Sequence, residues 1–385
     1  MPEALVNGRV LTDGGFATGH AVLIDGARIT AIVRDRDPRL RAVPRHDLHG
    51  GLLLPGFVDT QVNGGGGVLF NDNPTVEGIR IIGAAHRRFG TTGFLPTLIS
   101  DDLDVVATAI DAVRAAIEAR VPGVLGIHIE GPFLSEARKG VHDASRFRGL
   151  DDGIVALLSS LKVGKTLVTL APEVATPRTL ARLSAAGVIL SAGHTDATFA
   201  DIESARAHGL TGFTHLFNAM SPLTGREPGT VGAALYDPES WCGIIVDGRH
   251  VHPVVLRIAL RCKRLDRFML VTDAMATVGT TLTTFDLQGR TIHVRDGACV
   301  DEQGTLAGTA LDMARVVANA VSLLGLAPAD AIAMASTYPA RFLGLGDVLG
   351  RIAPGYRANL VLTDDALVVK DTWIDGERSS ASVLS

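Results

Sequence analysis

The chain has 385 residues, of which 46% are hydrophobic, 20% charged and 5% aromatic, and this balance excludes intrinsic disorder over most of the length. The length suits two or three domains, or one large barrel with a satellite domain. The net charge is −5, with 36 Lys and Arg against 41 Asp and Glu. Because the basic residues are scattered, we expect a small soluble substrate and no nucleic-acid partner.

The three cysteines, Cys242, Cys262 and Cys299, form no C-x-x-C pair. The sequence therefore indicates neither a disulfide framework nor a thiolate zinc cluster, and it favours a reducing compartment. The first residues lack the basic and apolar segments of a secretion signal, and no apolar run approaches the ~20 residues that span a bilayer. We therefore expect a cytoplasmic protein without a membrane partner.

Between Leu52 and Asp273, short β-forming runs alternate with stretches of helical period, which is typical of βα units around a parallel sheet. The predicted strands are Leu52–Asp59, Gly93–Thr97, Val124–Glu130, Leu167–Ala171, Val188–Ala192, Gly212–Phe217, Trp241–Val246 and Arg267–Thr272. The predicted helices are Val76–Phe89, Leu103–Ala119, Thr179–Ala186, Phe199–His208, Pro253–Arg261, Leu311–Leu324 and Ala327–Phe342. This order predicts an α/β fold, a TIM-like (β/α)8 catalytic barrel over residues 51–275 and 309–344.

The two ends of the chain have a different pattern. Residues Ala4–Val33 alternate in short β-like pieces, with a turn signal at Asp25-Gly26. Further strand-like runs occur late in the chain, at Phe285–Leu287, Thr291–Val294, Gly304–Leu306 and Ala358–Leu362. We expect them to combine into one small, discontinuous β-sandwich domain made of residues 1–50, 276–308 and 345–385.

Chemically active residues follow five of the predicted strands at their carboxyl ends, where barrel enzymes place their active sites. They are Glu130, His194, His215, His250 and Asp273. Glu130, His194 and His215 make a three-ligand set for a zinc-like ion with one position open for water, and Asp273 is placed to take that water's proton. The structural alternative is that each histidine is merely hydrogen-bonded and that Asp273 caps a turn.

Two further histidines lie near the third predicted strand. His128 alternates with Glu130 along that strand and points inward, which favours a hydrogen-bonded role in the core. His142 lies in the loop that follows. From the sequence alone, His142 is equally well interpreted as a surface residue or as a substrate contact.

Several motifs reinforce this interpretation. They are Pro55–Asp59, Gly126–Pro132, Ser191–Thr195, Thr214–Met220, Gly225–Gly229, Asp247–Pro253, Val271–Ala274 and Tyr338–Arg341. Together they resemble the amidohydrolase superfamily and, within it, the family of N-acetylglucosamine-6-phosphate deacetylases. The resemblance extends over nearly the whole chain, and the combination is far more specific than any single motif.

The resemblance assigns a role to each of a set of residues. It implies that Glu130, His194 and His215 bind the metal, that Asp273 is the catalytic acid and base, and that His250 polarises the acetamide carbonyl. The substrate-binding residues that it implies are Val141 and His142 at the sugar hydroxyls, Asn218, Ala219 and Arg226 at the 6-phosphate, and Leu306 and His250. Arg226 is expected to reach the active site of a neighbouring subunit, which implies a homodimer.

One departure from the superfamily pattern concerns the number of metals. The superfamily has His-x-His after the first strand and often a carbamylated lysine after the fourth, whereas this chain has Gln61 and Asn63 and no such lysine. Neutral amides are weak ligands for zinc-like ions, so Gln61 and Asn63 mark at most the remnant of a second site. We expect one divalent metal per chain, zinc first, with iron, cobalt and manganese also compatible.

The activity implied by the resemblance is hydrolysis of N-acetyl-D-glucosamine 6-phosphate to D-glucosamine 6-phosphate and acetate, in amino-sugar catabolism and cell-wall recycling. Metal-bound hydroxide would attack the acetyl carbonyl while Asp273 acts first as base and then as acid. Two alternatives are another amidohydrolase, dihydroorotase-like or an N-acyl-amino-acid deacylase, and a barrel that binds sugar phosphates without catalysis. The first would not need Arg226, and the second conflicts with the intact ligand set and Asp273.

Overall fold

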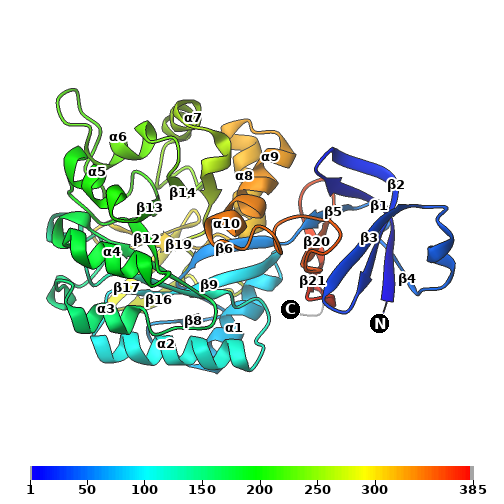
Figure 1. Cartoon of the computed structure of the whole chain (residues 1–385), viewed down its shortest axis with the longest axis horizontal. Coiled ribbons are helices and arrows are strands. Elements are labelled where there is room, and N and C mark those ends of the chain that lie inside the picture. The colour runs from blue at the N-terminus through cyan, green and yellow to red at the C-terminus, as the bar shows by residue number, and fades with distance from the viewer. Residues whose placement is uncertain (1, 382–385) are drawn as a thin grey trace.

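A computed structural model describes residues 2–381 and places them in a barrel and a smaller β domain, which lie side by side along the long axis (Figure 1). The described residues near both ends of the chain lie in the β domain, so the chain leaves that domain, builds the barrel and returns. Within the described residues, no helix combines the length and the apolar character needed to cross a membrane.

In the described part of the chain, eight parallel strands form the barrel sheet, in the spatial order β15-β14-β13-β12-β11-β10-β9-β6. Their bounds are β6 Phe57–Val62, β9 Thr91–Ile99, β10 Gly126–Glu130, β11 Lys165–Leu170, β12 Ile189–Ala192, β13 Leu210–Phe213, β14 Trp241–Ile244 and β15 Phe268–Leu270. Val62 forms a parallel bridge with Ala274 that links the last segment to the first. The predicted (β/α)8 barrel is confirmed.

The predicted strand Leu52–Asp59 is in fact two strands. Its first half, β5 (Leu52–Pro55), belongs to the β domain, and its second half is the barrel strand β6. The chain passes from one sheet to the other at Gly56, where a Cβ atom would lie 2.0 Å from Thr92 Oγ1. No side chain fits there, so the crossing point requires glycine.

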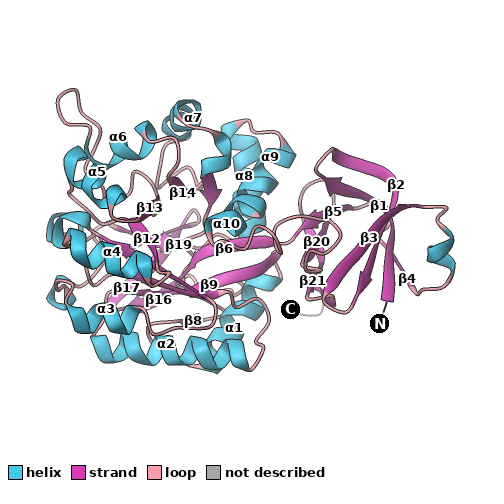
Figure 2. Cartoon of the chain, viewed as in Figure 1, coloured by secondary structure: helices cyan, strands magenta, loops and turns pink. Residues whose placement is uncertain are grey.

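Helices cover the outside of the barrel (Figure 2). They are α1 Val76–Arg87, α2 Leu103–Glu118, α3 Asp152–Leu158, α4 Pro177–Ala185, α5 Phe199–Ala207, α6 Gly229–Tyr236, α7 Pro253–Cys262, α8 Met313–Leu324, α9 Pro328–Ala335 and α10 Thr337–Phe342. Short 3-10 turns lie at Pro38–Arg41, Glu136–Arg138, Ala144–Arg146, Pro172–Val174 and Leu265–Arg267. The sequence did not predict α3, which is short, or α6, whose first six residues are all buried and therefore show no amphipathic period.

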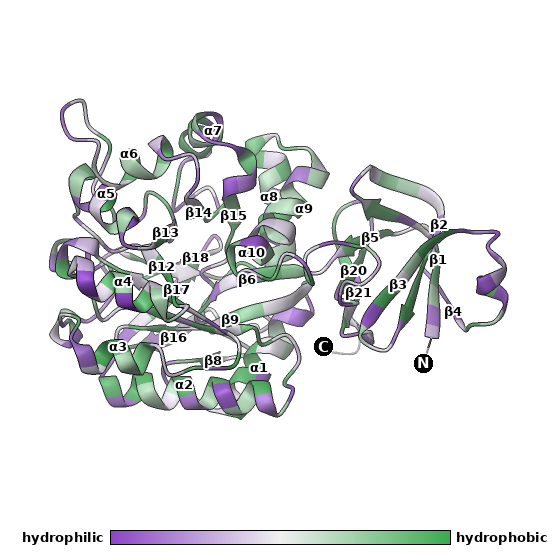
Figure 3. Ribbon diagram, viewed as in Figure 1, coloured by the Kyte–Doolittle hydropathy of each residue, from purple (hydrophilic) through white to green (hydrophobic). Residues whose placement is uncertain are grey.

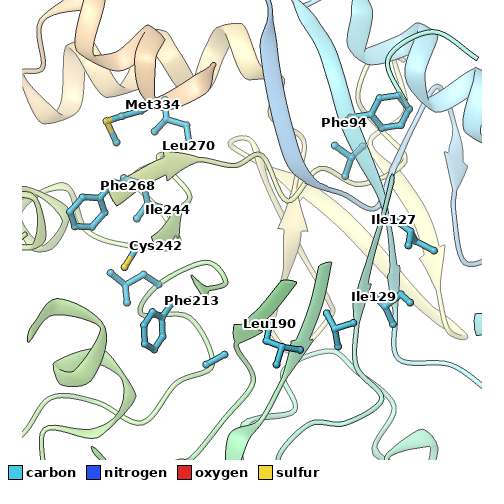
Figure 4. Packing of buried hydrophobic residues seen from close by; sticks show 14 of the residues in the cluster. Phe94, Ile127, Ile129, Leu190, Phe213, Cys242, Ile244, Phe268, Leu270 and Met334 are labelled. Carbon is cyan, nitrogen blue, oxygen red and sulfur yellow. The ribbon is translucent and has the colours of Figure 1, made fainter. Parts of the chain in front are cut away.

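The main core lies between the barrel strands and the helices, and Figure 4 shows side chains contributed by successive strands. Hydrophobic and hydrophilic residues alternate along outer helices such as α2 (Figure 3), and Val106, Ile110 and Val113 of that helix belong to the main core. On β10, Ile127 and Ile129 belong to this outer core. Because side chains alternate along a strand, His128 and Glu130 point into the barrel.

The described residues of the β domain form one sheet in the order β22-β21-β20-β5-β1-β2-β3, with β4 also paired to β1. The remaining bounds are β1 Pro2–Thr12, β2 Gly15–Asp25, β3 Arg28–Arg34, β4 Arg45–Asp47, β20 Leu360–Thr363, β21 Val369–Ile374 and β22 Glu377–Ser380. Successive residues of β1 lie in different apolar clusters, with Leu5 packed in the cluster of Trp373 and Ala4 in the cluster of Leu40. Both faces of this sheet are therefore buried.

The segment 276–308 does not join that sheet, contrary to our expectation. Its strands, β16 (Thr284–Leu287), β17 (Arg290–Arg295), β18 (Ala298–Val300) and β19 (Leu306–Thr309), form a separate antiparallel sheet. The reason is packing, because their apolar side chains bury against the barrel. Leu287, Ile292, Cys299 and Ala307 of the sheet share one apolar cluster with Ile99 and Met275 of the barrel. Leu69 joins the same cluster from a small hairpin made of β7 (Gly64–Gly65) and β8 (Val68–Leu69).

Candidate functional site

Three parallel strands bring the predicted ligand set together. Glu130 ends β10, and His194 and His215 follow β12 and β13. His215 Nε2 lies 2.9 Å from Glu130 Oε1 and 3.2 Å from His194 Nε2. His194 Nε2 lies 3.2 Å from the same Glu130 oxygen, and all three side chains are buried. The predicted ligands therefore form one compact cluster.

The backbone at these positions turns the side chains into the barrel mouth. His194, His215 and Asp273 have left-handed conformations, with φ of +49°, +32° and +51°. Residues other than glycine rarely adopt such angles, and they persist where the surrounding structure enforces them. Three such residues at the ends of β12, β13 and β15 support a functional origin for the arrangement.

The donor atoms of the cluster fit a divalent cation. His194 Nδ1 lies 3.0 Å from the carbonyl oxygen of Arg138, so it carries the ring proton and leaves the Nε2 lone pair directed toward Glu130. Burial by itself raises the pKa of Glu130, but the adjacent His194 and His215 side chains outweigh it and hold this pKa well below its usual range. One carboxylate and two imidazoles thus converge as acceptors, which suits Zn, Fe, Co or Mn.

Asp273 lies beside this cluster and is held by two amides. Its Oδ1 accepts hydrogen bonds from Gln61 Nε2 at 3.1 Å and from Asn63 Nδ2 at 2.7 Å. Burial, followed by repulsion from the Glu130 carboxylate, raises the pKa of Asp273. A carboxylate that gains proton affinity in this way is suited to accept a proton and release it again.

His250 lines the same cavity and is paired with Asp247, a residue to which the sequence analysis gave no role. Its Nδ1 lies 2.6 Å from Asp247 Oδ2, and the backbone N–H groups of Arg249 and His250 both donate to Asp247 Oδ1 at 2.8 Å. Burial raises the pKa of Asp247, but His250 and the two backbone N–H groups outweigh this effect, so the pKa of Asp247 lies below its usual value. The spacing Asp247-Gly-Arg-His250 carried the signal, because a side chain can accept from backbone groups two and three residues ahead.

A cavity of about 330 Å³ opens onto these residues. All but one of the substrate and catalytic residues predicted from the sequence line it, namely Glu130, Val141, His142, His194, His215, Asn218, Ala219, His250, Asp273 and Leu306. Sequence reasoning missed several others in the wall, namely Ile99, Ala137, Arg138, Gly140, Met275, Thr305 and Gly308. Most of these carry no catalytic type of side chain, so their residue types gave no signal.

The contacts of His128 and His142 show which role each of them has. His128 lies in the barrel core, 3.2 Å from Thr97 Oγ1 and 2.8 Å from Thr169 Oγ1, and burial lowers its pKa to about 4. The core role predicted for it is confirmed. His142 is buried against the cavity, and burial and then the neighbouring His194 lower its pKa. The surface interpretation of His142 is therefore wrong.

Arg226 is the predicted residue that this chain does not bring to its own cavity. It lies in the exposed loop of residues 222–228, before α6. Gln61 and Asn63 are also outside the cavity wall, behind Asp273, where they donate hydrogen bonds to it.

Comparisons with known proteins agree with this site. The model of the amidohydrolase family matches residues 52–378. The N-acetylgalactosamine-6-phosphate deacetylase of Shewanella sp. is 44% identical over 96% of this chain and 94% of its own, and the N-acetylglucosamine-6-phosphate deacetylase of Haemophilus influenzae is 36% identical over 98% and 99%.

Solved structures also resemble this chain over nearly its whole length. N-acetylglucosamine-6-phosphate deacetylase from Pasteurella multocida superposes with a TM-score of 0.95 at 35% identity, covering 99% of this chain and 100% of its own. A mutant of the Mycobacterium smegmatis enzyme, in which an aspartate is replaced by alanine, is in complex with N-acetyl-D-glucosamine-6-phosphate and superposes with a TM-score of 0.89 at 32% identity, covering 98% of each chain. The chain belongs to the amidohydrolase family and is a hydrolase related to the N-acetylhexosamine-6-phosphate deacetylases.

Proposed function

We propose that this protein hydrolyses the acetamide of N-acetyl-D-glucosamine 6-phosphate, releasing D-glucosamine 6-phosphate and acetate within amino-sugar metabolism. The observation that carries the proposal is the convergence of the Glu130, His194 and His215 cluster with Asp273 and His250 on one cavity. This combination supplies a cation site, a proton carrier and a polar group for a carbonyl oxygen, which are the needs of amide hydrolysis.

Glu130, His194 and His215 would hold the metal. When bound, a divalent cation polarises a carbonyl and makes water acidic enough to attack at neutral pH. Asp273 takes one proton from the attacking water and delivers it to the amide nitrogen, so that the C–N bond breaks to a neutral amine while acetate keeps the water's oxygen. The pKa of Asp273, raised by burial and by Glu130, favours the first half of this transfer, in which the carboxylate accepts the proton.

His250 stabilises the carbonyl oxygen as it gains charge. The carboxylate of Asp247, 2.6 Å from Nδ1, fixes the ring and complements its positive charge when both nitrogens carry protons. The Nε2–H then donates to the oxygen, and this bond strengthens as negative charge develops.

The 6-phosphate is bound by Asn218 and Ala219 and by Arg226 of a second subunit in a homodimer. Arg226 lies in an exposed loop of its own chain, while guanidinium groups bind phosphate oxygens through paired hydrogen bonds. Exposed apolar side chains occur in this loop and at the end of the helix that follows it, with Leu223 and Tyr236 exposed by 59% and 76%. Exposed apolar patches beside a functional loop support a protein interface there.

A second candidate substrate is the C4 epimer, N-acetyl-D-galactosamine 6-phosphate. The specific observation in its favour is the 44% identity to the Shewanella enzyme named for that sugar. The two sugars share the acetamide and the 6-phosphate, so the proposed roles of Asp273, His250 and Arg226 apply to both.

The deciding experiment is acetate release by protein whose metal has been counted, measured with both phosphorylated epimers and with unphosphorylated N-acetylglucosamine. We expect turnover of a phosphorylated sugar and a strong preference over the unphosphorylated one. Turnover of N-acyl amino acids or dihydroorotate instead would identify another amidohydrolase. Binding of the sugar phosphate without acetate release by metal-replete protein would identify a non-catalytic barrel.

A further inference from the structure

The tip of the β16–β17 hairpin contacts the active-site loops from outside the barrel. β16 and β17 pair with Leu287 opposite Arg290, so Gln288 and Gly289 form a two-residue turn. Both have left-handed backbones, with φ of +49° and +78°. This is the geometry of a tight hairpin turn, and it fixes the direction of the half-buried Gln288 side chain.

Gln288 uses both ends of its amide to join two loops of the barrel. Its Nε2 donates to the carbonyl oxygen of Ser100 at 2.7 Å, and its Oε1 accepts from the backbone N–H of Asp143 at 3.3 Å. Ser100 follows β9, and Asp143 lies in the loop after β10. The side chain therefore spans the ends of two neighbouring barrel strands.

His142 lies between the two anchored points. It precedes Asp143 in the chain, and its Nδ1 lies 2.8 Å from Ser100 Oγ and 3.4 Å from the Ser100 backbone nitrogen, whose N–H donates to it. An Nδ1 that accepts leaves the ring proton on Nε2. His142 is 2% exposed and lines the cavity, so its Nε2–H is the group available to a substrate oxygen.

We propose that Gln288 is a positioning residue that holds His142 in the orientation and tautomer needed to donate a hydrogen bond to the sugar. The assignment rests on the proposed function, since it takes His142 as a contact of the substrate. Gln288 itself is outside the cavity wall and acts through Ser100 and Asp143.

Ion pairs join the same two loops independently of Gln288. Arg146 pairs with Asp102, and Arg148 lies 3.6 Å from Asp102. These contacts remain when the Gln288 side chain is removed. We therefore expect Gln288→Ala to keep the fold and to lose the precise placement of the imidazole.

The test compares Gln288→Ala with Gln303→Ala, which removes an exposed amide from another turn of the same sheet. We expect Gln288→Ala to lower kcat/KM about tenfold, mainly through KM, the equivalent of one lost hydrogen bond to substrate. In a His142→Ala background the same substitution should have little further effect, because its target is gone. Kinetics equal to those of Gln303→Ala, or an undiminished penalty in the His142→Ala background, would overturn the proposal.

A second readout does not depend on turnover. Nitrogen NMR of 15N-histidine-labelled protein, assigned with His142→Ala, should show His142 with its proton on Nε2 in the unmodified chain and a mixture of tautomers in Gln288→Ala. An unchanged His142 signal would refute the positioning role. If the unmodified enzyme turns over neither sugar phosphate, the proposed function fails, and this spectrum still decides the role of Gln288.

Discussion

The amide of Gln61 donates from Nε2 to Asp273 Oδ1 across 3.1 Å, and the same nitrogen lies 3.1 Å from Glu130 Oε2. One neutral NH2 group thus joins two buried carboxylates that would otherwise repel each other. Asn63 adds a bond of 2.7 Å to Asp273. The two amides carry no charge, and they stabilise the neighbouring carboxylates by hydrogen bonding.

The first prediction concerns metal content. Because Gln61 and Asn63 are neutral amides that turn their donors toward Asp273, we expect one tightly bound divalent metal per chain by elemental analysis. Removal of the metal by a chelator should abolish acetate release and lower the unfolding temperature. Two tight equivalents in the unmodified protein would contradict this. The double variant Gln61→His with Asn63→His tests the cause and should bind a second equivalent.

The second prediction concerns proton transfer. Asp273→Asn keeps the size and the acceptor oxygen that Gln61 and Asn63 bind, but an amide does not carry the proton. We expect normal metal content and a fall in kcat of ~10²–10⁴-fold. The control is Asp286→Asn, an exposed carboxylate on β16. Unmodified kcat in metal-replete Asp273→Asn would remove this residue from the mechanism.

The third prediction separates transition-state from ground-state binding at His250. His250→Asn should lower kcat more than it raises KM, because its contact strengthens as the carbonyl oxygen becomes negative. Asp247→Asn should give a weaker effect in the same direction, since it removes the carboxylate 2.6 Å from His250 Nδ1. A change in KM alone would assign His250 to ground-state binding, and a loss of thermal stability without a kinetic effect would make it structural.

Strand-end residues were predictable because parallel strands end at the same side of a barrel. Glu130, His194 and His215 are 64 and 21 residues apart in the chain, yet their Nε2 and Oε1 atoms meet within 3.2 Å. The alternation of apolar and polar residues along β10 was enough to place Glu130 inward and next to this mouth.

Features that depend on which surfaces meet were not predictable. β propensity identified strands between residues 284 and 309 but carries no information on whether they pair with the β domain or pack on the barrel. The bonds of Gln288 to Ser100 and Asp143 join segments 188 and 145 residues away, and no local pattern encodes them. Arg226 was identifiable by its motif, but its distance from its own cavity appears only in three dimensions.

The fourth prediction concerns stability at acid pH. His86 on α1 is fully buried, with Nε2 2.8 Å from the Gly64 carbonyl oxygen, and burial lowers its pKa from 6.5 to about 4. Between these values the unfolded chain binds a proton that the folded chain does not, so the free energy of unfolding should fall as pH drops from 6.5 toward 4. His86 alone should lower the free energy of unfolding by on the order of 3 kcal/mol across this pH range.

His86→Gln removes the titrating group while keeping a donor for Gly64. We expect this variant to show a flatter dependence of unfolding free energy on pH across that window, measured by denaturant titration at each pH. His49→Asn, which changes an exposed histidine, is the matched control. An equally steep slope in His86→Gln would show that other groups cause the acid loss.

The fifth prediction concerns Arg226. Arg226→Ala should raise KM for the phosphorylated sugar and remove much of the preference over the unphosphorylated one, because paired, charge-assisted hydrogen bonds to phosphate have no counterpart in the neutral sugar. The matched control is Arg178→Ala, an exposed arginine on α4. Retained phosphate preference in Arg226→Ala would remove this residue from substrate recognition and leave Asn218 and the nearby backbone amides as the phosphate contacts.

Mixing the two impaired variants, with the phosphorylated sugar kept well below the KM of Arg226→Ala, tests whether Arg226 acts on the neighbouring subunit. In a mixed dimer of Arg226→Ala and Asp273→Asn, the Arg226→Ala chain supplies an intact Asp273 and receives an intact Arg226 from its partner, so one of the two sites is complete. With random exchange, activity should recover to about one quarter of the unmodified value, since half of the dimers are mixed. Exchange confirmed by mass without any recovery would place Arg226 and Asp273 of one chain in the same site and defeat the shared-site arrangement.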